Sequence, residues 1–312
     1  MQKVTANSLK LLGLIAVLVV IAVGCGGGGT SGEVDLSDAN ITVGSKEFTE
    51  QLILGQMSIL VLENDGATVK DQTRLAGSVA TRKALTSGQI DMYWDYTGTG
   101  WIVYLGHTKP IEGSQEQYKA VAKEDLKENG IVWLPPAPAN NTYAIAVRSE
   151  AANKLGVTKL SDLKPLFQEQ PEEASLCAAS EFLSRDDGLP GLEKAYGFEF
   201  KNISELAEGP IYQATDQGDK CTFGEVFATD GRLAQLDLKV LEDDKSFFPI
   251  YNPSLLVDKK VMDQYPQIEK IFAPINEKLT TEELQKLNEK VDVQGQLEDQ
   301  VAEEWLKENG FI

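Results

Sequence analysis

Tyrosine residues recur beside turn signals along this chain. They stand in the segments Asp95-Tyr96-Thr97-Gly98-Thr99, Asn140-Asn141-Thr142-Tyr143, Ile211-Tyr212-Gln213 and Pro249-Ile250-Tyr251-Asn252-Pro253. Loops run over the surface and often carry function, so rings at turns are poor core material. Their faces suit a quaternary ammonium group, a cation that has no hydrogen to donate. The pattern indicates a binding site for such a cation, although any single tyrosine is as often an ordinary core residue with its hydroxyl hydrogen-bonded.

Two basic side chains stand at turns where they could bind an anion. Lys46 lies between a predicted buried strand and a predicted helix, the place where α/β folds bind ligands. Arg185 precedes an Asp-Asp-Gly turn. An arginine fork and a lysine ammonium both suit a carboxylate. The alternative for these residues is an exposed cation paired with its neighbour in sequence, Glu47 or Asp186, which would contribute little.

The elements that must position these side chains alternate in type. Strands are predicted at 41–44, 69–75, 90–94 and 131–134, and helices at 49–65, 78–87 and 116–129. Such alternation predicts a mainly parallel sheet with helices on both faces. A proline-rich stretch at 135–141 breaks the pattern and predicts a crossover into a second lobe of the same kind. The segment 247–253 predicts the crossover by which the chain returns to the first lobe. We therefore predict an α/β fold of two lobes joined by two hinge crossovers, a clamp that closes on a ligand.

The N-terminus has the features of an export signal. Lys3 and Lys10 precede an apolar run that is too short to span a bilayer, and Ala22-Val23-Gly24-Cys25 resembles a lipobox with lipid on Cys25. An ordinary secretory peptide is the alternative. The predicted parts are thus a signal peptide (1–24), a lipidated cysteine with a flexible tether (25–40), lobe 1 (41–141 plus 252–312) and lobe 2 (142–251).

Composition excludes several classes of function. The net charge of −19 argues against nucleic-acid binding, which depends on lysine and arginine. With one histidine and no CxxC spacing, neither a metal site nor a cofactor is expected. Cys177 and Cys221 remain as an even pair in an oxidising compartment, and we predict a disulfide between them, with two buried free thiols as the alternative.

Several motifs together resemble one family, the substrate-binding proteins of ABC transporters for glycine betaine, choline and related osmoprotectants. The resemblance covers roughly 41–310 and rests on the segments Gly44-Ser45-Lys46-Glu47-Phe48-Thr49-Glu50-Gln51, Tyr96-Thr97-Gly98-Thr99, Asn141-Thr142-Tyr143-Ala144, Asp187-Gly188-Leu189-Pro190-Gly191-Leu192 and Thr229-Asp230-Gly231-Arg232. It implies a type II periplasmic-binding-protein fold with the ligand between the lobes.

The resemblance also implies a set of ligand-binding residues. An aromatic cage would come from Tyr96, Tyr143 and Tyr251. Phe227 falls where some relatives have tyrosine, so this position keeps an aromatic ring but lacks the hydroxyl. Tyr212 matches a further family position. The residues that correspond to those gripping a betaine carboxylate are Lys46, Thr99 and Arg185. This set favours a carboxylated zwitterion such as glycine betaine over choline.

We therefore expect a lipid-anchored, extracytoplasmic or periplasmic monomer that delivers a quaternary ammonium solute to an ABC permease without doing chemistry. Choline, carnitine, an amino acid or a polyol are alternative ligands on the same fold. An exported hydrolase or transferase using Ser45 and Lys46 is a distant alternative, because neither a GxSxG motif nor a triad histidine accompanies them.

Overall fold

The computed structural model describes residues 35–312. The predicted signal peptide, Cys25 and most of the predicted tether lie outside the described residues. Across 35–312, no helix has both the length and the apolar character needed to cross a membrane.

One five-stranded sheet is built from both ends of the described chain. Its strands are β1 (Asn40–Lys46), β2 (Thr68–Leu75), β3 (Met92–Tyr96), β4 (Ile131–Trp133) and β10 (Pro253–Asp258). They lie in the order β2-β1-β3-β10-β4. β1 pairs parallel with β2 and β3, whereas β10 pairs antiparallel with β3 and β4. The one reversed strand is the one that returns from the second sheet.

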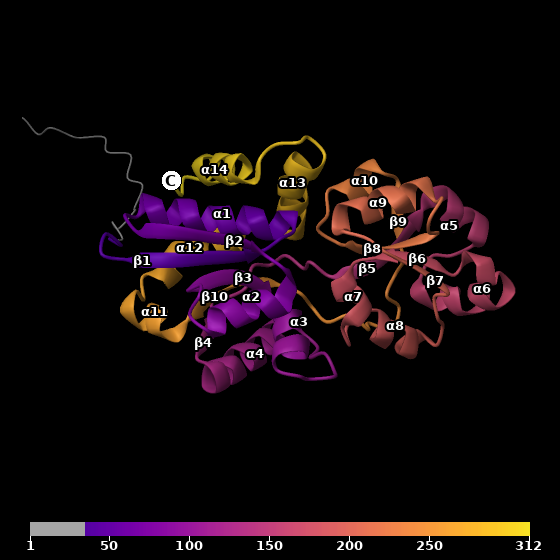
Figure 1. Ribbon diagram of the computed structural model, residues 1–312, viewed down its shortest axis with the longest axis horizontal. Coiled ribbons are helices and arrows are strands. Elements are labelled where there is room, and N and C mark those ends of the chain that lie inside the picture. Colours follow the sequence, from indigo (N-terminus) through magenta and orange to yellow (C-terminus); the bar gives the residue numbers. More distant parts are fainter. Residues whose placement is uncertain (1–34) are drawn as a thin grey trace, which may run out of the picture. The chain divides into compact units, whose positions relative to one another are not determined.

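Helices cover both faces of this first sheet. They are α1 (Thr49–Asn64), α2 (Gly77–Thr86), α3 (Thr97–Thr99), α4 (Ser114–Asn129), α11 (Lys259–Gln264), α12 (Ile268–Lys278), α13 (Thr281–Asp292) and α14 (Glu298–Glu308), with a π-helical turn at Gly100–Tyr104. α1 and α14 lie along one face, and α2 and α4 along the other (Figure 1). Because strand side chains alternate between faces, Leu255 and Val257 join one core and Leu256 the other.

The second five-stranded sheet repeats this topology. Its strands are β5 (Tyr143–Arg148), β6 (Ser175–Ala178), β7 (Asn202–Glu205), β8 (Phe223–Phe227) and β9 (Leu238–Val240), in the order β7-β6-β8-β5-β9. β6 pairs parallel with β7 and β8, and β5 antiparallel with β8 and β9. Its helices are α5 (Ser149–Leu155), α6 (Leu163–Glu169), α7 (Ser180–Ser184), α8 (Leu189–Tyr196), α9 (Glu208–Gln217) and α10 (Arg232–Gln235). Short 3-10 turns lie at Leu160–Asp162 and Pro171–Glu173.

The two sheets give the two-lobed α/β fold of periplasmic binding proteins that the sequence predicts. The chain passes between the sheets after β4 and again before β10. We propose that the lobes divide at the predicted boundaries, 41–141 with 252–312 and 142–251.

Cys177 and Cys221 are joined by a disulfide bond across a sequence separation of 44 residues. Cys177 lies in β6, and Cys221 lies two residues before the start of β8. Both cysteines are buried among residues of α9. The bond therefore ties β6 to the segment that leads into β8, its neighbour in the sheet.

Candidate functional site

The predicted site residues lie close together because they stand at the ends of strands that meet at the same edge of each sheet. Lys46, Tyr96 and Phe227 are the last residues of β1, β3 and β8, and Tyr143 is the first residue of the reversed strand β5. Tyr251 precedes the other reversed strand, β10. The carboxyl ends of parallel strands and the start of an antiparallel strand meet at one edge, which is where open α/β sheets bind ligands.

A cavity of about 680 Å³ lies where these edges meet. Its lining includes seven of the eight predicted ligand-binding residues, namely Lys46, Tyr96, Thr99, Tyr143, Arg185, Phe227 and Tyr251. This volume is within the range of small-molecule sites. Both sheets contribute walls, so the cavity has the position expected for a ligand held between two lobes.

Tyr212 does not line this cavity, and its predicted role as a ligand-binding residue is corrected. The sequence placed it beside a turn, but it lies inside α9, where it is fully buried. Its hydroxyl accepts a hydrogen bond from the backbone N–H of Phe227 at 2.9 Å, and the guanidinium of Arg232 lies 4.2 Å from its ring centroid. Tyr212 therefore stabilises the carboxyl end of β8 by a hydrogen bond from α9.

The aromatic rings form a continuous wall. Phe48 lies nearly parallel to Tyr96 and to Phe227, with centroid distances of 6.3 and 5.6 Å. Tyr143 lies 5.0 Å from Phe227 and meets Tyr251 edge to face at 5.5 Å. Ring faces from both sheets thus surround one space, and each face could contribute about 0.5–2 kcal/mol to binding of a cation.

Tyr251 is positioned by a glycine and an acid. A Cβ atom at position 98 would lie 2.7 Å from the Tyr251 ring, so the ring can reach its place only because residue 98 is glycine. The hydroxyl of Tyr251 donates to Asp187 at 2.7 Å. Burial raises the pKa of Tyr251 well above its ordinary value, so its hydroxyl stays protonated and neutral.

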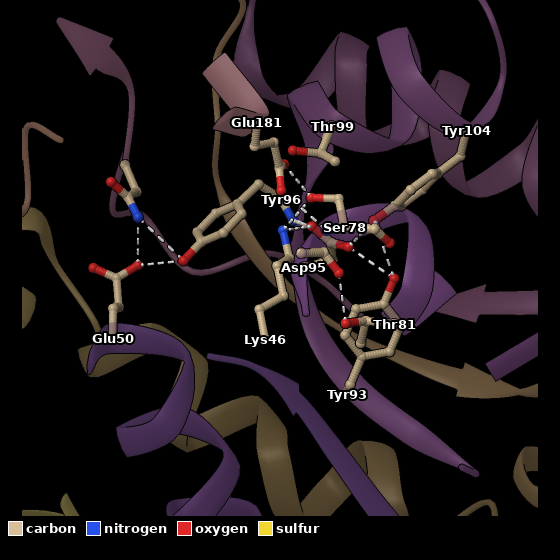
Figure 2. Close-up of polar contacts among 12 residues, drawn as sticks. Lys46, Glu50, Ser78, Thr81, Tyr93, Asp95, Tyr96, Thr99, Tyr104 and Glu181 are labelled. Carbon is tan, nitrogen blue, oxygen red and sulfur yellow. Dashed lines mark hydrogen bonds and ion pairs between the residues drawn. The ribbon is translucent and has the colours of Figure 1, made fainter. Parts of the chain in front are cut away.

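Lys46 reaches the cavity with its charge already paired. Its ammonium donates to Asp95 at 2.8 Å and to Ser78 at 3.0 Å, as Figure 2 shows. Asp95 is fully buried and also accepts from the hydroxyls of Tyr93 and Tyr104. The expected alternative of an exposed lysine paired with its sequence neighbour is wrong, because Lys46 is buried and its partner comes from β3.

Arg185 is likewise bound to acids of the protein. Its guanidinium forms a bidentate pair with Asp187, at 2.7 and 2.6 Å, and donates to Glu181 at 2.6 Å. A longer contact of 3.4 Å reaches the hydroxyl of Thr99 from the other sheet. The structure therefore brings the three predicted carboxylate-binding residues to one wall, with both cations already neutralised by protein carboxylates.

Acids outnumber bases on the cavity wall. The lining includes five acids, Glu47, Glu181, Glu205, Glu208 and Glu225, and two bases, Lys46 and Arg185. The Glu225 side chain is buried, with one oxygen accepting from the backbone of Ala179 at 3.1 Å and the other without a hydrogen-bond partner among residues 35–312. Burial raises the pKa of Glu208 and of Glu225, so these two acids hold their protons more readily than an exposed glutamate does. Ring faces together with the acids of this wall suit a ligand with positive charge.

The geometry gives no support for nucleophilic chemistry by Ser45 and Lys46. The Ser45 hydroxyl donates to the backbone carbonyl of Lys46 and accepts from the backbone of Arg74, whereas the lysine ammonium points to Asp95. Within residues 35–312, no group of three or more histidine, cysteine or acidic side chains is arranged to hold a metal ion.

Comparison with known proteins agrees with this geometry. Residues 39–308 match the family described as the substrate-binding domain of ABC-type glycine betaine transport systems. The chain belongs to this family. The family consists of substrate-binding components of transport systems, not of enzymes, and it works with ABC transporter permeases on small quaternary ammonium ligands.

Two curated relatives and one solved structure illustrate the match. The chain is 36% identical over 278 residues to the glycine betaine-binding protein YehZ of Escherichia coli, covering 87% of this chain and 91% of the relative. It is 37% identical over 279 residues to the glycine-betaine-binding protein of Pseudomonas aeruginosa, covering 87% and 88%. A solved structure of a glycine betaine/carnitine/choline ABC transporter protein aligns with a TM-score of 0.70 at 29% identity, over 87% of this chain and 99% of that one.

Sequence reasoning missed several residues of the cavity. Phe48 lies at the strand-to-helix junction that the sequence marked for Lys46, but no turn glycine or asparagine adjoins it. Glu225 could have been found as an acid inside an apolar strand, Phe-Gly-Glu-Val-Phe. Glu181 and Asp95 carried no local signal for their contacts with Ser78 and Lys46, because these partners lie far along the chain.

The buried acid Glu225 predicts a measurable pH dependence. Burial raises its pKa from 4.5 to about 7. Between these values the folded protein retains a proton that the unfolded chain has released, so the free energy of unfolding falls as pH rises. Relative to wild type, Glu225→Gln should therefore gain roughly 3 kcal/mol between pH 4.5 and pH 8. Urea unfolding of both proteins at these two pH values measures this gain, and a difference that is independent of pH would contradict it.

Proposed function

We propose that this protein captures a methylated quaternary ammonium solute between its two lobes and delivers it to an ABC permease. Glycine betaine is the first candidate, because both curated relatives described above are glycine betaine-binding proteins. Choline and carnitine are the next candidates on the same chemistry. The protein acts by binding alone and needs no cofactor.

A single observation carries this proposal: aromatic rings from both sheets line one acid-rich cavity. Tyr96 and Phe48 come from the first sheet, Tyr143 and Phe227 from the second, and Tyr251 from the return crossover. A methylated ammonium cannot donate hydrogen bonds, so ring faces and carboxylates are its best partners. A polyol would instead need many hydrogen-bonding groups, which ring faces do not supply.

We propose Tyr96, Tyr143, Tyr251, Phe227 and Phe48 as the cage, and Lys46, Thr99 and Arg185 as the residues nearest a ligand carboxylate. Phe48 is the addition that the geometry supports, because it stacks between Tyr96 and Phe227. We also propose that Cys25 carries lipid and holds the protein, as a monomer, on the outer face of the cell membrane or in the periplasm.

A ligand panel in a thermal-shift assay tests the proposal. A ligand that binds only the folded state stabilises it by RT ln(1 + [L]/Kd), about 2.7 kcal/mol at a hundredfold excess over Kd. We expect glycine betaine, choline or carnitine to raise the melting temperature in proportion to the logarithm of concentration. Glycine and sorbitol serve as controls without methylated ammonium. A response to sorbitol or glycine alone would assign the fold to another solute.

A further inference from the structure

One carboxylate in the cavity already lies where a ligand carboxylate is expected. Glu181, in α7 on the second sheet, accepts hydrogen bonds from the backbone N–H and the hydroxyl of Ser78, at 3.1 and 2.6 Å. Ser78 lies in the first turn of α2, on the first sheet. Arg185 adds a third donor at 2.6 Å. We call these three donor groups, from Ser78 and Arg185, the anion seat.

The anion seat stabilises a negative charge. It combines the N-terminus of the ten-residue helix α2 with a guanidinium, and helix N-termini attract anions. Lys46 extends it, because its ammonium donates to the Ser78 hydroxyl that in turn donates to Glu181 (Figure 2). Although burial opposes ionisation of Glu181, the charges of Lys46 and Arg185 and the hydrogen bonds from Ser78 lower its pKa to about 2.

The seat coincides with the predicted position of a ligand carboxylate. Lys46, Thr99 and Arg185 form the predicted carboxylate-binding set, and all three line the cavity beside Glu181. Figure 2 shows Glu181, Thr99 and Ser78 grouped near the end of Lys46. The Glu181 side chain keeps 32% of its surface exposed, so another carboxylate could displace it.

We propose that Glu181 is a specificity-determining residue whose carboxylate occupies the anion seat and competes there with the carboxylate of a zwitterionic ligand. This inference rests on the proposed function. A zwitterion such as glycine betaine must displace Glu181, whereas a cation without a carboxylate binds the cage with Glu181 in place. Glu181 therefore lowers the affinity for zwitterions relative to cations and broadens the ligand range toward choline-like cations.

Glu181 also bridges the two sheets, and the test must separate this role from competition. Loss of the bridge weakens closure of the two lobes and so lowers the affinity for every ligand by the same factor. The ratio of the affinities for two ligands is therefore unaffected by loss of the bridge. Glu181→Gln keeps the shape of the side chain but removes its charge and replaces one acceptor oxygen by an amide N–H group, so at least one donor of the seat loses its acceptor. Glu205→Gln is the matched control, because Glu205 is an exposed acid of the same lining that lies outside the seat.

Calorimetric titration of wild type, Glu181→Gln and Glu205→Gln with glycine betaine and with choline tests the proposal. We expect Glu181→Gln to raise the ratio of betaine affinity to choline affinity by about tenfold or more, and Glu205→Gln to change it less than about threefold. Glu181→Ala should shift the ratio in the same direction. An unchanged ratio in both Glu181 variants, or an equal shift in Glu205→Gln, would overturn this inference and leave the proposed function intact. Absence of binding of either ligand to all proteins would overturn both.

Discussion

Replacing Tyr143 by leucine is expected to weaken binding of a methylated ammonium ligand by about tenfold to thirtyfold. Tyr143 has the most central ring of the wall, in contact range of Phe227, Tyr251 and Phe182. Leucine fills much of the volume but has no ring quadrupole to attract a cation, a contribution of up to about 2 kcal/mol in a desolvated site. Calorimetric titration with choline and with glycine betaine measures the loss.

Two variants control this prediction. Tyr143→Phe keeps the ring face and should retain affinity within about threefold. Tyr265→Leu removes a tyrosine outside the cavity, whose hydroxyl donates to the backbone of Asp38, and should leave affinity unchanged. Equal losses in the leucine and phenylalanine variants at position 143 would show that the hydroxyl, and not the ring face, matters for binding.

Replacing Lys46 by methionine is expected to lower the free energy of unfolding by about 3–5 kcal/mol. The ammonium of Lys46 is the only cation within 4 Å of the buried carboxylate of Asp95 among residues 35–312. Removing one member of a buried pair leaves an uncompensated charge in a poorly solvated place. Urea unfolding followed by circular dichroism measures the change.

The companion variants separate charge from packing. Adding Asp95→Asn to Lys46→Met removes the uncompensated charge and should restore most of the lost stability. Lys259→Met breaks an exposed pair with Asp263 and should cost less than about 1 kcal/mol. If Lys46→Met costs no more than Lys259→Met, then Lys46 is free to serve a ligand and its pairing with Asp95 is of little consequence.

The fold could be predicted from local patterns because its elements alternate along the chain. The strand and helix periods predicted β1 to β4 and the helices α1, α2 and α4 close to their observed bounds, whereas α3 lies where a turn was predicted. Prolines at 135–141 and 247–253 marked the two crossovers. The reversal of β5 and β10 could not be read from these patterns, because strand direction depends on how the chain re-enters a sheet, which is a tertiary property.

The candidate site could be predicted in position but not in electrostatics. Tyr96 and Tyr143 were found because strand ends and turns carry their own sequence signals. The partners of the cations were missed: pairing with Glu47 or Asp186 was the alternative to ligand binding, but Lys46 pairs with Asp95, 49 residues away. Tyr212 was predicted beside a turn, yet it lies inside α9, which includes Pro210 in its first turn, where proline is tolerated.

The most direct test of this account is a calorimetric comparison of choline with its neutral isostere, in which a tert-butyl group replaces trimethylammonium. The two molecules have nearly the same shape, so they differ mainly in the charge that ring faces and carboxylates can attract. The account predicts saturable binding of choline, at least about tenfold tighter than binding of the isostere. Equal affinities of the two compounds would contradict the claim that this cavity recognises a quaternary cation.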